Sequence, residues 1–190
     1  MSEHESLASP NADHGDFAAA TIDELAELFA LLELPHALTG GHAVNQYTAP
    51  RLTYDLDFVV TPGKQGPARC RRLLEMVGYE VQREEGSDGD GGPAFVRLKH
   101  NGRGVMVDIL EARTSFEQSL LQRAVRMDDL PFPVARPEDL IIGKLVSDRQ
   151  RDQRDVLELA AVEGLDRGYI RDWAQRWHVM DVYERLLGSN

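Results

Sequence analysis

The feature that most constrains this chain is a glycine pair followed, a short distance later, by two aspartates in one strand. Gly40-Gly41 ends a short apolar run, and Asp55 and Asp57 lie in the segment 52–60, where they alternate with apolar residues. Because side chains alternate across a strand, the two carboxylates share one face and their apolar neighbours share the other. Two carboxylates this close repel each other, so one takes up a proton unless a cation lies between them. The stretch therefore predicts a divalent-metal site beside a glycine turn that phosphate can approach.

The composition is that of a soluble globular protein. The 190 residues are 42% apolar and 28% charged, enough for one sizeable core or for one domain with a small helical addition. No apolar run approaches the roughly 20 residues that a membrane span needs. Residues 1–16 lack the basic-then-apolar order of a secretory signal, and Cys70 has no second cysteine to pair with. We therefore expect a cytoplasmic protein with no membrane partner.

The net charge of −11 argues against a protein that coats DNA or RNA without sequence preference, because such binding needs many Lys and Arg on the phosphates. A local basic groove stays compatible with this charge. The arginines at 149, 151 and 154 form one cluster, which is more often a solvated helix face than a binding track.

The periodicity of apolar residues predicts an α+β fold. We expect a disordered leader over residues 1–20, a core over 21–136 and a C-terminal helical region over 137–190 packed on that core. Thr21 and Glu24 have the spacing of a capping box, which predicts that Thr21 is the N-cap of the first helix. The patterns predict strands at 36–39, 52–60, 79–83, 94–100, 105–110 and 132–135, and helices at 22–33, 67–77, 115–125, 137–162 and beyond 166.

A third carboxylate lies in the second arm of a predicted hairpin. Asp108 lies between Val107 and Ile109, after the turn 101–104. A charged residue inside an apolar strand needs a partner, a metal or access to water. If this strand pairs beside the strand of Asp55, all three carboxylates meet on one face of the sheet.

Three carboxylates on one face suit Mg²⁺, which prefers a few carboxylates together with water and substrate phosphates. Two ions held by Asp55 and Asp57 could clamp the attacking and leaving oxygens of an in-line displacement. Asp108 would then bind the ion that activates an acceptor hydroxyl, or take its proton.

These residues resemble a known signature. Gly40-Gly41 followed by Asp55-Leu56-Asp57 is similar to the motif of the nucleotidyltransferase superfamily, which shares the catalytic fold of DNA polymerase beta. Within that superfamily the AbiEii-type branch is similar in its ordered motifs, which cover residues 36–160. The motifs are Arg51-x-Thr53-x-Asp55-Leu56-Asp57, Pro137-Glu138-Asp139-Leu140-Ile141-x-x-Lys144, and Lys144 followed by Arg151-Asp152 and Asp155.

The resemblance implies a small mixed or antiparallel sheet flanked by helices, with a C-terminal helical extension. It implies an enzyme that transfers a nucleoside monophosphate from a nucleoside triphosphate to an acceptor hydroxyl and releases pyrophosphate. Asp55, Asp57 and Asp108 would bind Mg²⁺, and Lys144 would neutralise phosphate charge. The residues assigned to nucleotide or phosphate binding are Gly40, Gly41, His42, Arg51, Thr53, Lys144, Asp152 and Asp155.

His42, and Lys144 together with the acidic residues that follow it, allow a second interpretation. His42 stands where many superfamily members have Ser; it can donate the same hydrogen bond, or it can serve as a capping or core residue. Lys144, Asp148, Asp152 and Asp155 fall on one stripe of a single helix, which surface ion pairs would also explain.

Three functions are open, of which two differ in the acceptor and one involves no transfer. Many AbiEii-type proteins are toxins of toxin–antitoxin pairs and some modify transfer RNA, which predicts an RNA acceptor and a cognate antitoxin. Antibiotic-modifying relatives instead transfer the nucleotide to a small molecule. A third alternative is a module that binds nucleotide or a protein partner without catalysis, against which the retained aspartates argue.

Overall fold

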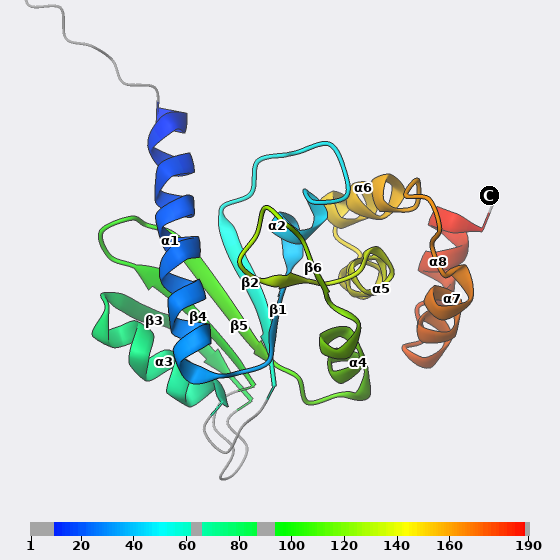
Figure 1. Ribbon diagram of the computed structural model, residues 1–190. Helices are drawn as coiled ribbons and strands as arrows, with labels where there is room; N and C mark the ends of the chain where they lie inside the picture. The colour runs from blue at the N-terminus through cyan, green and yellow to red at the C-terminus, as the bar shows by residue number, and fades with distance from the viewer. Residues whose placement is uncertain (1–9, 62–65, 87–93, 189–190) are drawn as a thin grey trace, which may run out of the picture.

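The strands form one mixed sheet, and its order brings the two predicted acidic strands side by side. In this computed structural model, which describes residues 10–61, 66–86 and 94–188, the sheet has seven strands in the order β3-β4-β5-β2-β1-β7-β6 (Figure 1). The α+β fold class is thereby confirmed. The strands are β1 (His36–Thr39), β2 (Asp55–Val60), β3 (Tyr79–Glu85), β4 (Phe95–His100), β5 (Met106–Glu111), β6 (Val125–Arg126) and β7 (Pro133–Val134).

The central strand β2 has one parallel and one antiparallel neighbour. It pairs parallel with β5 and antiparallel with β1, while β4 pairs antiparallel with β5 as the predicted hairpin requires. Along β2, Leu56, Phe58 and Val60 are buried on one face of the sheet, and Asp55 and Asp57 point to the other. The alternation expected from the sequence is therefore present.

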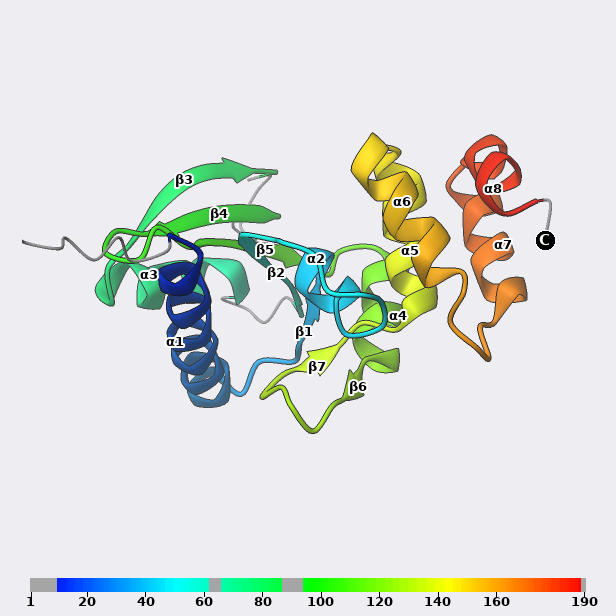
Figure 2. The same ribbon diagram turned by 90° about the horizontal axis from the view of Figure 1, so that it is seen from above.

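Helices cover both faces of the sheet (Figure 2). α1 and α3 lie on the face of Phe58, whereas α2 and α4 lie on the face of Asp57. The remaining helices form a C-terminal group beside the sheet, where α5 contacts α2, α6 and α7. The helix bounds are α1 (Pro10–Leu32), α2 (Gly40–Val44), α3 (Gly66–Met76), α4 (Ser115–Arg123), α5 (Pro137–Ser147), α6 (Gln150–Leu159), α7 (Arg167–Arg176) and α8 (Met180–Leu187).

An aromatic cluster holds the α1 face of the sheet. Phe58 of β2 lies with its ring centroid 5.1 Å from that of Phe29 and 4.9 Å from that of Phe132. His36 stacks on Phe29 at 4.3 Å. These contacts fix β2 against α1 and against the chain before β7, so the carboxylates on its other face project from a rigid strand.

The N-terminal part of the prediction is wrong in two respects. α1 begins at Pro10, so residues 10–20 are helical and not a disordered leader; residues 1–9 lie outside the described residues. The run Ala18–Ala20 has high helix propensity and carries the helix through Thr21, which is fully buried in its interior. Thr21 is therefore no N-cap: Arg103 donates to its hydroxyl and to Glu24 instead.

The long helix expected over 137–162 is two helices. α5 ends at Ser147, Asp148 adopts a left-handed conformation with φ of 42°, and α6 starts at Gln150. A left-handed residue at this position ends a helix by redirecting the chain. Lys144 and Asp152 therefore do not share one helical stripe; they face each other across the corner between α5 and α6.

Two further differences are small. β2 begins at Asp55, so residues 52–54 precede the strand, and β6 was not predicted. No helix in the described part of the chain is both long and apolar enough to cross a bilayer.

Candidate active site

The register of the sheet sets four polar side chains in one row. Thr39 of β1 pairs with Asp57 of β2, Asp57 pairs with Asp108 of β5, and Asp108 pairs with Arg97 of β4. Paired residues point to the same face of a sheet. The row therefore consists of one hydroxyl group, two carboxylates and one guanidinium. Asp55, two residues before Asp57, lies on the same face. The predicted meeting of the three carboxylates is therefore present.

The glycine turn lies directly against this row. Gly40 has φ of 63°, and a Cβ added to it would come within 1.9 Å of Oδ2 of Asp57. A Cβ on Gly41 would come within 2.4 Å of the hydroxyl oxygen of Thr53. Both glycines are thus needed for close approach of the backbone, and Gly40 for its left-handed conformation as well. Gly40 therefore lies beside Asp57 as the sequence predicted, whereas Gly41 lies against Thr53.

Asp57 is in an unfavourable electrostatic position in the protein alone. Burial, together with the neighbouring charges of Asp108 and Asp55, raises the pKa of its carboxyl group to about 7, although Lys144 and Arg97 act to lower it. Among the described residues, no side chain or backbone group donates a hydrogen bond to it. A bound cation would offset the repulsion between the carboxylates and give the buried Asp57 carboxylate a partner.

Arg97 is a member of the site that sequence reasoning missed. Its guanidinium donates two hydrogen bonds to Asp108, at 2.7 and 2.5 Å, and lies 3.8 Å from Oδ2 of Asp55. These bonds to Asp108 raise the pKa of Arg97 above its ordinary value. The hairpin turn already fixed this pairing, since a register that sets residues 99 and 106 opposite each other also sets 97 opposite 108.

Lys144 does not stand free above the site. Its ammonium group lies 2.7 Å from Asp152 and 2.8 Å from Asp155, and all three residues are buried. Burial raises the pKa of Asp152, but the hydrogen bonds from Lys144, Ser147 and Arg149 outweigh it and lower the pKa to about 2. Asp152 and Asp155 are therefore placed to hold cations, and not to bind phosphate themselves.

The same network extends to Arg51, which was predicted to bind phosphate, and to Arg149. Arg51 donates two hydrogen bonds of 2.7 Å to Asp155, and Arg149 donates one of 2.6 Å to Asp152. The cluster thus sets three cations against two carboxylates, with one positive charge in surplus. Arg149 is exposed, as expected for the solvated cluster, and its guanidinium also joins this network.

His42 lies at the edge of the site. Burial lowers the pKa of its imidazole, the charge of Asp55 opposes this, and the charge of Arg51 adds to it. The ring is half-buried, and among the described residues no hydrogen bond to its nitrogens is present. The neutral form is therefore favoured, which makes His42 a weak partner for phosphate.

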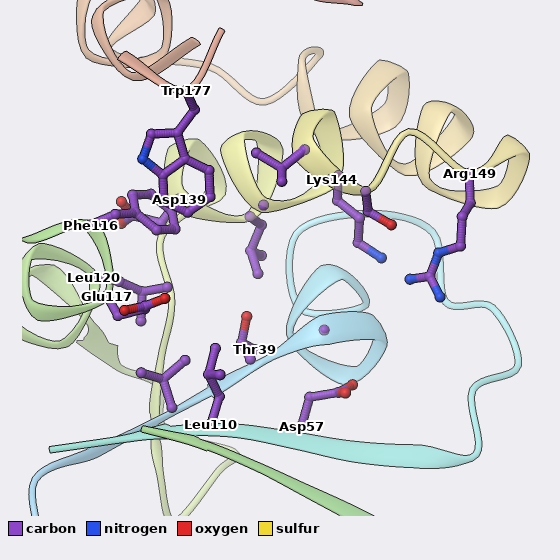
Figure 3. Close-up of a pocket in the computed structure, with 16 residues that line it drawn as sticks. Thr39, Asp57, Leu110, Phe116, Glu117, Leu120, Asp139, Lys144, Arg149 and Trp177 are labelled. Carbon is purple, nitrogen blue, oxygen red and sulfur yellow. The ribbon is translucent and has the colours of Figure 1, made fainter. Parts of the chain in front are cut away.

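A pocket of about 410 Å³ extends from this row across the sheet (Figure 3). At one end Asp57 and Gly40 lie below Lys144 and Arg149 of the α5–α6 corner. At the other end the side chains of Phe116, Leu120 and Trp177 gather with Glu117 and Asp139. The floor between the two ends is formed by Val59 and Leu110. Both basic side chains of the pocket thus lie at one end, and its aromatic rings lie at the other together with two carboxylates.

The aromatic end is held by its own polar network. Asp139 accepts hydrogen bonds from the Tyr169 hydroxyl at 2.7 Å and from Arg123 at 3.2 Å. The Arg123 guanidinium also lies 3.8 Å from the centre of the Tyr169 ring. Trp177 packs against Phe116, with ring centroids 4.9 Å apart. α4, α5 and α7 are thereby joined into one wall of the pocket.

The carboxylates fit a divalent ion at one place better than at another. Asp57 has carboxylate oxygens without a donor and a glycine against it, whereas Asp108 is already paired with Arg97. Within the described ranges, no group of three or more His, Cys, Asp or Glu side chains is arranged to hold a metal ion. The donor set of Asp55 and Asp57 suits a hard cation that completes its shell with water and phosphate oxygens.

Solved structures with the same arrangement of elements are nucleotidyltransferases. The crystal structure of ANT(2″)-Ia in complex with adenylyl-2″-tobramycin superposes with a TM-score of 0.58 at 16% identity, over 88% of this chain and 99% of that chain. The lincomycin-bound crystal structure of the lincosamide antibiotic adenylyltransferase LnuA superposes with a TM-score of 0.54 at 18% identity, over 73% of this chain and 93% of that chain. The crystal structure of the Megavirus polyadenylate synthase superposes with a TM-score of 0.53 at 15% identity, over 87% of this chain and 41% of that chain.

The chain has a nucleotidyltransferase fold. At identities this low the similarity bears on the fold alone. No protein-family model matches the sequence, and no curated protein matches it either. The AbiEii-type branch therefore rests on the motifs alone and stays a prediction.

Proposed function

We propose that this protein is a divalent-metal-dependent nucleotidyltransferase that moves a nucleoside monophosphate from a nucleoside triphosphate to an acceptor hydroxyl and releases pyrophosphate. One observation carries the proposal: Asp57, in register with Asp108, lies against Gly40 at the end of a pocket whose opposite wall presents Lys144 and Arg149. Acidic side chains on one wall and basic ones on the other suit a substrate that brings both a metal ion and phosphates.

The residues of the chain would divide the work as follows. Gly40 and Gly41 let the turn pack against Asp57 and Thr53, because neither has a Cβ. The backbone N–H groups at this helix start would then bind the triphosphate. Lys144 and Arg149 offset phosphate charge, held in position by Asp152. Asp155 holds Lys144 from the other side and orients Arg51. The base and ribose would occupy the end formed by Phe116 and Trp177.

Asp55 and Asp57 would hold the ion, which we take to be Mg²⁺. When bound, it would polarise the phosphate undergoing attack and favour the deprotonated acceptor hydroxyl. Asp57 keeps its carboxylate aimed at that position through the close packing of Gly40. Asp108, paired with Arg97, contributes fixed negative charge beside it.

Two classes of acceptor are in contention. The AbiEii-type resemblance favours RNA such as tRNA, with the protein acting as a toxin held in check by a cognate antitoxin. A small molecule is the second candidate, favoured by the net charge of −11, which gives long RNA little to bind. The fold shared with LnuA, a lincosamide antibiotic adenylyltransferase, and with the antibiotic-resistance factor ANT(2″)-Ia supports this second candidate as well.

The experiment is a transfer assay with each of the four nucleoside triphosphates, labelled at the α-phosphate, in the presence of Mg²⁺ and a cell extract. We expect one triphosphate to label the extract, and Asp57→Asn to abolish labelling. Separation of the extract then identifies the acceptor, since label in the RNA fraction supports the first class and label in the small-molecule fraction the second. Equal labelling by wild type and variant would refute the proposal, and nucleotide binding without transfer would indicate a non-catalytic module.

The toxin role has a separate test. Induced expression in a bacterial host should arrest growth if the acceptor is an essential RNA, and Asp57→Asn should relieve the arrest. Relief by a gene next to this one would identify the antitoxin. Growth unaffected by the active protein would remove the toxin role and leave the transferase activity in place.

A further inference from the structure

Arg97 has a position that the proposed reaction does not yet explain. It is the fourth member of the in-register row Thr39–Asp57–Asp108–Arg97, and it lies on the hairpin arm next to β5. Nε and Nη2 of Arg97 donate hydrogen bonds of 2.7 and 2.5 Å to the two carboxylate oxygens of Asp108. This is the geometry of a bidentate guanidinium–carboxylate pair. Such a pair is stronger and more directional than a contact with a lysine in the same place.

The guanidinium also reaches the second carboxylate. Nη2 of Arg97 lies 2.5 Å from Asp108 and 3.8 Å from Asp55, so one cation is shared between two of the three aspartates. Only 10% of the Asp108 side chain is exposed, whereas 36% of the Arg97 side chain is. Asp108 is thus covered largely by Arg97 and by its neighbours in the sheet.

Charge balance points the same way. Three ionised aspartates and one arginine leave two negative charges, which one divalent ion neutralises. A second divalent ion would have to share Asp108 with a guanidinium that stays protonated throughout the physiological range. Two like charges that approach one carboxylate repel each other strongly in a partly buried site.

We propose that Arg97 is a fixed cation of this centre, which occupies Asp108 and limits the metal site of the free protein to one divalent ion, held by Asp55 and Asp57. The inference rests on the metal site of the proposed function. It replaces the two-ion centre expected from the sequence with one ion and one guanidinium. Arg97 is accordingly a positioning residue, because it acts through Asp108.

The test counts bound ions and needs no turnover. Mn²⁺ is titrated into the wild-type protein and the free ion is followed by electron paramagnetic resonance. We expect one site in the wild type, lost in Asp57→Asn and retained in Asp108→Asn, because Asp108 is not a ligand while Arg97 holds it. Arg97→Gln should show a second site, or at least tenfold tighter binding at the first.

Two variants separate charge from folding. Arg97→Lys keeps the charge and should keep one site. Arg103→Gln removes an arginine of the same hairpin that pairs with Glu24 at 2.8 Å, far along the hairpin from Asp108, and should bind Mn²⁺ as the wild type does. Circular dichroism establishes that each variant is folded.

Two ions in the wild type would overturn the inference whatever the variants do, and so would equal number and affinity in Arg97→Gln and wild type. The outcome is independent of catalysis. A protein that gains a second ion in Arg97→Gln but transfers no nucleotide would retain this inference and lose the proposed function. A protein that transfers nucleotide but binds two ions in its free form would do the reverse.

Discussion

Gly40 lies so close to Asp57 that any side chain at position 40 would collide with the carboxylate: a Cβ there would be 1.9 Å from Oδ2 and 2.4 Å from Cγ. The backbone of the turn and the acid of the strand therefore pack as one unit. Because Asp57 pairs with Asp108 and Thr39, a displacement at Gly40 passes directly into the row of polar side chains.

Gly40→Ala should destabilise the protein by about 2 kcal/mol or more, because it adds a left-handed strain to a steric collision. The matched control is Gly143→Ala, at a helical glycine whose added Cβ would have no atom within 4 Å. That change should stabilise by up to about 1 kcal/mol through helix propensity. Urea unfolding of both variants measures the effect, and shifts of the same sign would contradict the close packing of Gly40.

Lys144 should be needed for stability as well as for function. Lys144→Met leaves Asp152 and Asp155 buried with fewer cations, which we expect to cost about 3–5 kcal/mol. Arg154→Met, at an exposed pair with Glu158, should change stability by less than about 1 kcal/mol. Adding Asp152→Asn to Lys144→Met should recover part of the loss. Strict additivity of the two changes would show that the residues do not interact.

The pH dependence of stability should report on Asp152. Its pKa in the folded protein is about 2, below the ordinary value of 3.8, so the folded state binds this proton less readily than the unfolded state does. The carboxylate then contributes about 2 kcal/mol above pH 4, which is lost as the pH falls through 2. The stability difference between wild type and Asp152→Asn should shrink correspondingly from pH 7 to pH 3. A difference independent of pH would contradict an ionised Asp152 in the network.

Trp177 should report nucleotide binding by its fluorescence. The chain has two tryptophans, of which Trp177 lines the pocket and Trp173 packs behind it against Phe116. A nucleoside triphosphate should quench the emission of the wild type and of Trp173→Phe, and should leave Trp177→Phe nearly unchanged. Equal quenching in the two variants would place the base elsewhere.

Much of the acidic row could be predicted from sequence because its determinants are local. The alternation in 55–60 assigns Asp55 and Asp57 to one face, and a hairpin at 101–104 brings Asp108 into a paired strand. What local pattern left open was the neighbour of that strand, and the parallel β2–β5 pairing settles it. Arg97 was within reach of the same reasoning, since the register of the hairpin determines its partner.

The basic wall of the pocket could not be predicted in the same way. Asp148 turns the chain in a left-handed conformation without a glycine or proline to signal the break, so a continuous helix was the natural expectation. The ion pairs of Lys144 with Asp152 and Asp155 depend on that break. The aromatic end depends on Trp177 packing against Phe116, a contact between residues far apart in the chain that periodicity does not encode.

The most direct measurement compares two labels of one triphosphate in the transfer assay. For nucleotidyl transfer, label at the α-phosphate should appear on the acceptor, and label at the γ-phosphate should be released in pyrophosphate. The Asp57→Asn variant should neither label the acceptor nor release pyrophosphate. Acceptor labelled from the γ-phosphate, or α-label transferred equally by wild type and Asp57→Asn, would contradict the account.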